Sequence, residues 1–282
     1  GNFGPAGSIP KAMAEAGGVR FAEALLGEEA EVTLAAMRAA SAEDVLGVRM
    51  PLSRATVDGW VFPASIYEIF AAGDQMDIPV IVGSNADEGT MFTPPEISPE
   101  GYRAGLEGRF GELAEEFLET YPAAGGEEAW ASQVDIFTDT TFGWEMRTWA
   151  RMMDTVPADA YLYFFSRKPP TAEGDPFAHY GAYHTAEIPY VFDNFGVSES
   201  PHADRAWDAT DRELSNVLAS YWVNFAATGD PNGEGLPEWP AFDANADEAL
   251  EIGDTIQIRP GVRKARLDLV DKHYAAQRAD AP

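Results

Sequence analysis

The sequence predicts an α/β fold with a largely parallel sheet. Two short runs rich in β-branched and aromatic residues, at 78–84 and 161–165, are apolar at nearly every position. Strands that are apolar on both faces are typical of a sheet covered by helices on both sides. Long stretches with helical spacing separate these runs, an order that favours parallel strands. The 282 residues are enough for one large domain of this class or two small ones.

The N-terminal quarter carries helix signals of moderate strength. A helix is expected over about 10–25, with proline in its first turn and Gly27 at its end. Ser41, with Asp44 three residues later, predicts a second, short helix that begins with a capping box. The stretch 57–60, Val-Asp-Gly-Trp, is typical of a turn.

The rest of the chain alternates helical and strand-like patterns. The best helix signal follows Thr210-Asp-Arg-Glu213, which has the form of a capping box, and Gly229 would end that helix. Two strand-like pieces, 249–252 and 256–258, and a charged helix from about Gly261 complete the chain. Three further helices are expected between the two apolar runs, around Phe110, Leu113, Phe117 and Leu118; Trp130, Val134 and Phe137; and Phe142, Met146, Trp149 and Met153.

Charge and composition exclude several classes of function. The net charge is −28, from 47 acidic and 19 basic residues, and such a surface repels nucleic-acid phosphates and anionic lipid headgroups. No run of about 18 apolar residues occurs, so no membrane-spanning helix is expected. The absence of cysteine excludes disulfides, thiol catalysis and cysteine-type zinc sites. No targeting segment is expected within the printed residues, and the sequence does not determine the cellular compartment.

Two polar stretches follow the predicted strands, where catalytic residues of α/β proteins gather. Asp87 and Glu88 come after the first strand, and His184 comes after the second. An acid followed by a histidine is the order of the last two members of a hydrolase triad. Two simpler interpretations remain open at this point. His184 could be a structural histidine, and the stretch with Asp87 and Glu88 could be an ordinary turn. A metal site built from His179, His184 and Glu187 is a weaker alternative, because no helix places the three on one face.

Three spaced motifs resemble a known family. The stretches "IPVIVGSNADEGTMF", "GAYHTAEIPYVF" and "SNVLASYWVNFAATGDPNGEGLPEWPAFD" are similar to type-B carboxylesterases, the cholinesterase-like branch of the α/β-hydrolases, which includes bacterial p-nitrobenzyl esterases. The likeness runs from about Val57 to Phe242. It implies an α/β-hydrolase fold, a small carboxylic ester as substrate, and no metal or organic cofactor. It also implies that Glu88 is the triad acid and His184 the base.

The resemblance suggests further candidates around this pair. Phe92, Phe142 and Tyr183 could line an acyl or alcohol pocket, although core packing is the more usual fate of any one of them. Ser215, on the long helix, could be a hydroxyl near the triad or an ordinary helix serine. Asp87 is expected to be a loop acid.

One part of the family pattern is missing from this sequence. No serine has glycine two residues before and two after it, and no "HGGG"-type oxyanion loop occurs. The family carries both elements N-terminal to the stretches matched here. Residues 1–282 are therefore expected to form the C-terminal part of a single α/β-hydrolase domain, with the half that carries the nucleophile elbow absent. That missing half is the expected partner, and alone the chain is expected to lack esterase activity and to expose an apolar strand edge at 78–84.

Two other functions compete with an ester hydrolase. A non-catalytic adhesion or binding module of the same fold would carry a different residue at the serine position. A metal-dependent hydrolase using His179 and His184 would bind metal and lose activity with a chelator. The retention of both Glu88 and His184 favours the enzyme.

Overall fold

The computed structural model describes residues 3–5, 7–27, 30–49, 54–171, 174–175, 178–195 and 205–280. The chain divides into two compact units, an N-terminal unit, Gly1–Asp74, and a C-terminal unit, Gln75–Pro282.

The N-terminal unit contains one small parallel pair of strands and short helices. Strand β1, Ser8–Pro10, pairs with β2, Ala55–Val57. The predicted capping box is confirmed, because Ser41 and Asp44 exchange side-chain and backbone hydrogen bonds. The predicted turn at 57–60 is also confirmed, since the Asp58 carboxylate accepts the N–H groups of the three following loop residues, Trp60 to Phe62. The helices are α1 (Lys11–Leu26), α2 (Leu34–Ala39), α3 (Ala42–Gly47) and α4 (Ile66–Ala72).

The C-terminal unit is built on a four-stranded sheet in the order β3-β4-β5-β6. Pairing is parallel from β3 to β5 and antiparallel between β5 and β6, which a short turn connects. The expectation of a mostly parallel sheet is confirmed, with strand ends within a few residues of those predicted. The strands are β3 (Val80–Asn85), β4 (Ala160–Phe165), β5 (Glu248–Ile252) and β6 (Ile256–Pro260).

The helices of the C-terminal unit differ from the predicted ones at three places. The helix expected around Phe110–Leu118 is two helices, separated at Gly111. The two helices expected around 130–153 are joined by a π-helical segment, η3, at Asp139–Gly143. The α-helices are α5 (Pro99–Phe110), α6 (Ala114–Thr120), α7 (Gly126–Thr138), α8 (Trp144–Met153), α9 (Ile188–Val191), α10 (Ala209–Thr228) and α11 (Lys264–Ala279).

The third difference is the start of α10. Its capping box is formed by Asp208 and Asp211, two residues before the predicted Thr210 and Glu213. Arg167 explains the choice, because its guanidinium forms ion pairs with both aspartates and so stabilises them at the helix start. The helix ends at Gly229, as predicted.

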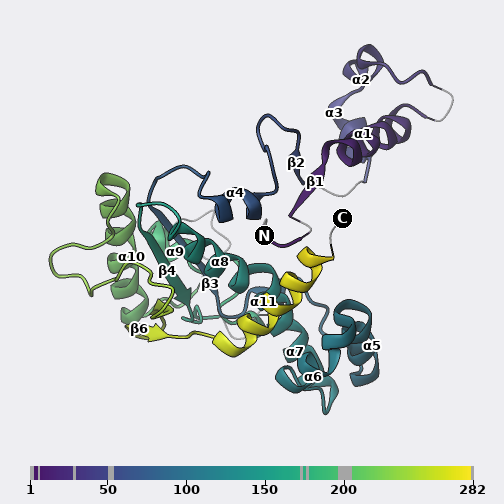
Figure 1. Ribbon diagram of the computed structural model, residues 1–282. Helices are drawn as coiled ribbons and strands as arrows, with labels where there is room; N and C mark the ends of the chain where they lie inside the picture. Colours follow the sequence, from purple (N-terminus) through teal and green to yellow (C-terminus); the bar gives the residue numbers. More distant parts are fainter. Residues whose placement is uncertain are drawn as a thin grey trace. The chain divides into compact units, whose positions relative to one another are not determined.

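Helices cover both faces of the sheet (Figure 1). On one face, Tyr161 and Phe165 of β4 belong to a buried cluster with Leu218 and Tyr221 of α10 and with Trp239. On the other face, α8 packs on β3 and β4, and α11 packs on α8. This two-layer burial confirms the prediction that β3 and β4 are apolar because helices enclose them.

Strand β3 lies at one edge of the sheet. Its only strand neighbour among the described residues is β4. The strand is apolar at 80–82, with Ile81 half-buried and Val82 buried. Separately, none of the helices in the described ranges is long and apolar enough to cross a membrane.

Candidate active site

The predicted acid and base meet at the carboxyl end of the sheet. Glu88 begins a 3-10 helix, η1 (Glu88–Met91), directly after β3. One of its oxygens, Oε1, accepts the backbone N–H of Asn85 at 2.8 Å. The other, Oε2, lies 2.6 Å from Nδ1 of His184. When Glu88 is ionised it can only accept, so Nδ1 then donates its proton and Nε2 is left as a proton acceptor.

Burial sets the electrostatics of Glu88. The residue is only 4% exposed. Burial raises the pKa of its carboxyl, while the Asn85 N–H and the His184 ring act in the opposite direction. The charged form therefore depends on these two partners, and each of them also fixes where the carboxylate points.

His184 lies on a loop between a 3-10 turn, η4 (Ala178–Tyr180), and α9. Its side chain is 39% exposed, in contrast to the buried Glu88. The next residue, Thr185, has a φ of 77°, a left-handed conformation that is rare for a β-branched residue. Backbone strain of this kind clusters at functional sites. The geometry presents an imidazole whose inner nitrogen is held and whose outer edge is open.

Two of the predicted pocket residues flank this imidazole. The ring of Phe142 lies 4.9 Å from that of His184, and the ring of Phe92 lies 5.4 Å from it. Phe92 is 48% exposed, so the apolar surface beside His184 is partly open. Their assignment to a substrate pocket stays a prediction.

The other two candidates lie in the core. Tyr183 is buried in the cluster that packs on β4, and the guanidinium of Arg205 covers its ring at 5.4 Å. Ser215 is fully buried, and its hydroxyl lies within hydrogen-bond distance of the Tyr190 carbonyl and the Asp193 carboxylate. These contacts connect α10 to α9 and to the segment after it, and they involve neither Glu88 nor His184. These surroundings fit the alternatives stated for the two residues, which are core packing for Tyr183 and an ordinary helix serine for Ser215.

Asp87 was expected to be a loop acid, and it also binds the loop that carries His184. Its N–H donates to the carbonyl of Ala182, and its carboxylate accepts the Ala182 N–H at 2.8 Å. The approach is close, since a Cβ added at Gly181 would lie 2.1 Å from the Asp87 carboxylate. Gly181 also has a φ of 65°, which favours glycine. The turn that carries Glu88 and the loop that carries His184 are thus joined directly.

Asn85 is a second link that sequence reasoning missed. It is 1% exposed, and its amide nitrogen donates to the Tyr183 carbonyl at 2.8 Å and to the Glu187 carboxylate at 2.6 Å. The side chain therefore connects the end of β3 to both sides of His184. Its only sequence signal is its place at the end of the strand.

The metal alternative has no ligand set in the described ranges. There, no three histidine or acidic side chains form a group that could hold a metal ion. His179 packs against the rings of Trp130 and Tyr180, and Glu187 accepts the Asn85 amide. Neither residue joins His184 in a shared site.

Comparison with known proteins identifies the family. The model of the carboxylesterase family matches residues 21–270. The chain belongs to the carboxylesterase family. Its sheet and flanking helices are those of the α/β-hydrolase fold of p-nitrobenzyl (PNB) esterases, as the motifs predicted. Over 93% of the chain, a PNB esterase superposes with a TM-score of 0.72 and a thermophilic PNB esterase with 0.74, each at 25% identity.

Curated carboxylesterase relatives are longer than this chain. The fumonisin B1 esterase of Sphingopyxis macrogoltabida is 29% identical over 259 residues, which cover 82% of this chain and 44% of the relative. The para-nitrobenzyl esterase of Bacillus subtilis (strain 168) is 29% identical over 209 residues, 72% of this chain and 40% of the relative. The chain therefore spans less than half the length of these relatives.

Proposed function

We propose that this chain supplies the acid and the base of a carboxylic ester hydrolase with a serine nucleophile. The observation that carries the proposal is the 2.6 Å contact between the buried Glu88 carboxylate and Nδ1 of a partly exposed His184. A carboxylate in this place fixes the tautomer and orientation of the ring and stabilises its cation. The outer nitrogen is then ready to take a proton.

The chemistry is acyl transfer in two steps. Nε2 of His184 takes the proton of the serine hydroxyl while the serine oxygen attacks the ester carbonyl. The resulting imidazolium, stabilised by Glu88, returns that proton to the leaving alcohol, and an acyl-serine remains. Water then attacks the acyl group in the same way, releasing the acid and the free serine. Phe92 and Phe142 beside the ring favour an ester with an apolar acyl or alcohol group.

We further propose that the nucleophile and the oxyanion donors belong to a segment outside these 282 residues. The sequence has no Gly-x-Ser-x-Gly, and its curated relatives are more than twice as long as the part that they share with it. The apolar edge of β3 is suited to pair with a further strand. Because each oxyanion donor contributes about 10²–10³ in rate, the chain alone is expected to be inactive.

Turnover of p-nitrophenyl acetate and labelling by a fluorophosphonate probe test this proposal. The isolated chain is expected to show neither, and both are expected when it is expressed together with the preceding segment. In that complete protein, His184→Ala should abolish turnover, whereas His179→Ala, which alters a histidine outside the pair, should leave it intact. Equal activity of the two variants would overturn the assignment. Turnover by the isolated chain, lost in His184→Ala, would place a serine nucleophile within these residues.

A further inference from the structure

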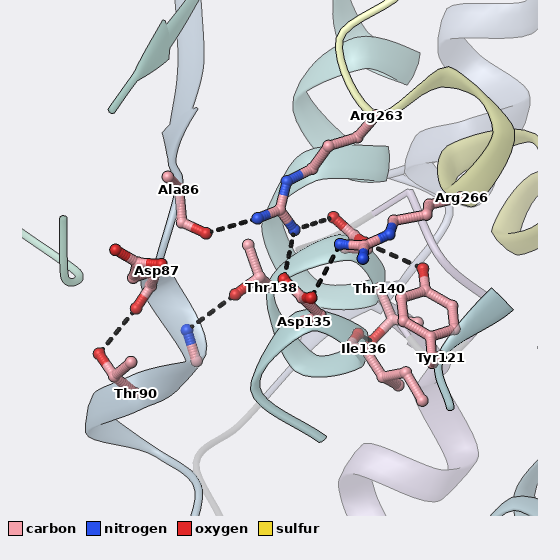
Figure 2. A network of polar contacts seen from close by, with 12 residues as sticks. Ala86, Asp87, Thr90, Tyr121, Asp135, Ile136, Thr138, Thr140, Arg263 and Arg266 are labelled. Carbon is pink, nitrogen blue, oxygen red and sulfur yellow. Dashed lines mark hydrogen bonds and ion pairs between the residues drawn. The ribbon is translucent and has the colours of Figure 1, made fainter. Parts of the chain in front are cut away.

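Two side chains from other elements bind the backbone of the turn that carries Glu88, one on each side of that residue. Ala86 precedes Glu88 by two residues, and Gly89 follows it directly. Both use backbone groups to bind side chains that come from other elements. Figure 2 shows Ala86 with Arg263, and Thr138 on the other side of the turn. The two anchors are distant in sequence from the turn, at 138 and 263.

The first anchor is Thr138, at the end of α7. Its hydroxyl oxygen accepts the N–H of Gly89 at 2.9 Å, and the side chain is 1% exposed. The turn presses closely on this helix, because a Cβ added at Gly89 would lie 2.4 Å from the carbonyl oxygen of Val134. A hydroxyl at 138 therefore fixes the backbone of the residue next to the acid.

The second anchor is Arg263, just before α11. Its guanidinium donates through one nitrogen to the Ala86 carbonyl at 2.8 Å. Through the other terminal nitrogen it binds Asp139 at 2.8 Å and Asp135 at 3.0 Å. A planar guanidinium can bind the Ala86 carbonyl and the two carboxylates at once in a fixed geometry. A lysine ammonium cannot reproduce this arrangement.

The main support for Arg263 is a buried carboxylate. Asp139 is fully buried, and its second carboxylate oxygen accepts the hydroxyl of Tyr121 at 2.9 Å. Burial raises the pKa of Asp139, and Arg263 is the strongest influence in the opposite direction. Arg266 forms an ion pair with Asp135 at 2.8 Å beside it. These partners therefore fix the position of the guanidinium that donates to the turn.

We propose that Thr138 and Arg263 are positioning residues that hold the 86–89 turn from two sides and so set the distance between Glu88 and His184. The inference rests on the proposed function, and it assigns to α7 and the start of α11 a part in that site. A displacement of the turn lengthens the contact between the carboxylate and Nδ1, which weakens the support of the imidazole during proton transfer. Substrate contacts are left unchanged, so the loss is expected in kcat and not in KM.

Arg263→Lys in the complete protein tests the second anchor. The substitution keeps the positive charge beside Asp139 but removes the guanidinium nitrogen that donates to the Ala86 carbonyl. The matched control is Arg147→Lys, because Arg147 likewise bridges two aspartates, Asp247 and Asp268. We expect kcat to fall by about 10- to 100-fold for Arg263→Lys with KM within about twofold, and no change in kcat for Arg147→Lys. Equal effects of the two substitutions on kcat would overturn the proposal.

Thr138 allows a test without a change of charge. Thr138→Val removes the acceptor of the Gly89 N–H, and Thr138→Ser keeps it. The control is Thr140→Val, because Thr140 is as buried but bonds to Ile136 and Arg109, away from the turn. We expect a fall in kcat of about tenfold for Thr138→Val, recovery with Thr138→Ser, and wild-type kcat for Thr140→Val. A Thr138→Val enzyme with wild-type kcat would overturn the proposal.

A spectroscopic readout separates this inference from the proposed function. The proton in the short Nδ1 to Glu88 contact is expected far downfield in the proton NMR spectrum of the complete protein. The signal should move upfield or vanish in Arg263→Lys and Thr138→Val and persist in both controls. It does not depend on turnover, so an inactive wild-type protein would contradict the function while leaving the positioning role testable. An unchanged signal in both anchor variants would contradict the positioning role alone.

Discussion

Asp87 and Ala182 are joined by two hydrogen bonds, one in each direction. The Asp87 N–H donates to the Ala182 carbonyl, and the Ala182 N–H donates to the Asp87 carboxylate at 2.8 Å. The acid turn and the histidine loop are therefore one connected substructure. The proposed catalysis by Glu88 and His184 is expected to depend on this connection.

Removing the Asp87 carboxylate should damage both stability and rate. Asp87→Ala leaves the N–H of the buried Ala182 without its carboxylate acceptor, at a cost of about 1–3 kcal/mol in the free energy of unfolding. It should also lower kcat, since the histidine loop is released from the acid turn. Asp77→Ala is the control, because Asp77 likewise accepts one backbone N–H, that of Ala158 at 2.8 Å, but lies before β3. Urea unfolding and ester turnover of the complete protein check the pair. Loss of kcat in both variants would contradict a local role.

Glu88→Gln should preserve the fold and remove most of the activity. The amide oxygen can still accept the Asn85 N–H, but the amide nitrogen would then face Nδ1 and favour the tautomer with its proton on Nε2. That tautomer cannot act as the base, and a loss of about 10⁴-fold in kcat is expected with little change in KM. Steady-state kinetics measure the effect. A decrease confined to KM would show that Glu88 binds substrate instead.

The same substitution should change how stability depends on pH. Burial raises the pKa of Glu88 above its ordinary value of 4.5, so the folded protein holds this proton more tightly than the unfolded chain. The favourable contribution is present below 4.5 and is lost as the pH rises through the folded pKa. Glu88→Gln does not titrate, so its stability relative to wild type should increase over this window and then level off. Urea unfolding of both proteins at several pH values checks the sign. A relative stability that falls with pH would contradict it.

Thr185→Gly should stabilise the protein. Thr185 has a φ of 77°, and the left-handed region costs a residue with a Cβ roughly 1–2 kcal/mol. Part of the gain is offset by the greater freedom of glycine in the unfolded chain, which leaves an increase of about 0.5–1 kcal/mol in the free energy of unfolding. Thr185→Ala is the control, because it removes the hydroxyl and methyl but keeps the Cβ. Equal stability of the two variants would show that the strain is relieved elsewhere.

Local patterns in the sequence predicted the scaffold well. The apolar runs at 78–84 and 161–165 became β3 and β4, because strands enclosed by helices must be apolar on both faces. The acid and the histidine that follow these strands were predicted to cooperate, and parallel neighbouring strands bring them to the same edge. One error occurred where a partner distant in sequence decided the outcome. The start of α10 moved to Asp208 because Arg167 binds there.

The amino-acid sequence by itself determined the fold class, the family and the pair Glu88 and His184, since periodicity and motifs are local properties of the chain. Only the tertiary structure decided how that pair is held. Asn85, Thr138 and Arg263 act through contacts with residues that are 49 to 177 positions away. No pattern in their own neighbourhoods records such contacts, because a hydrogen bond depends on distance in space and folding brings these groups together.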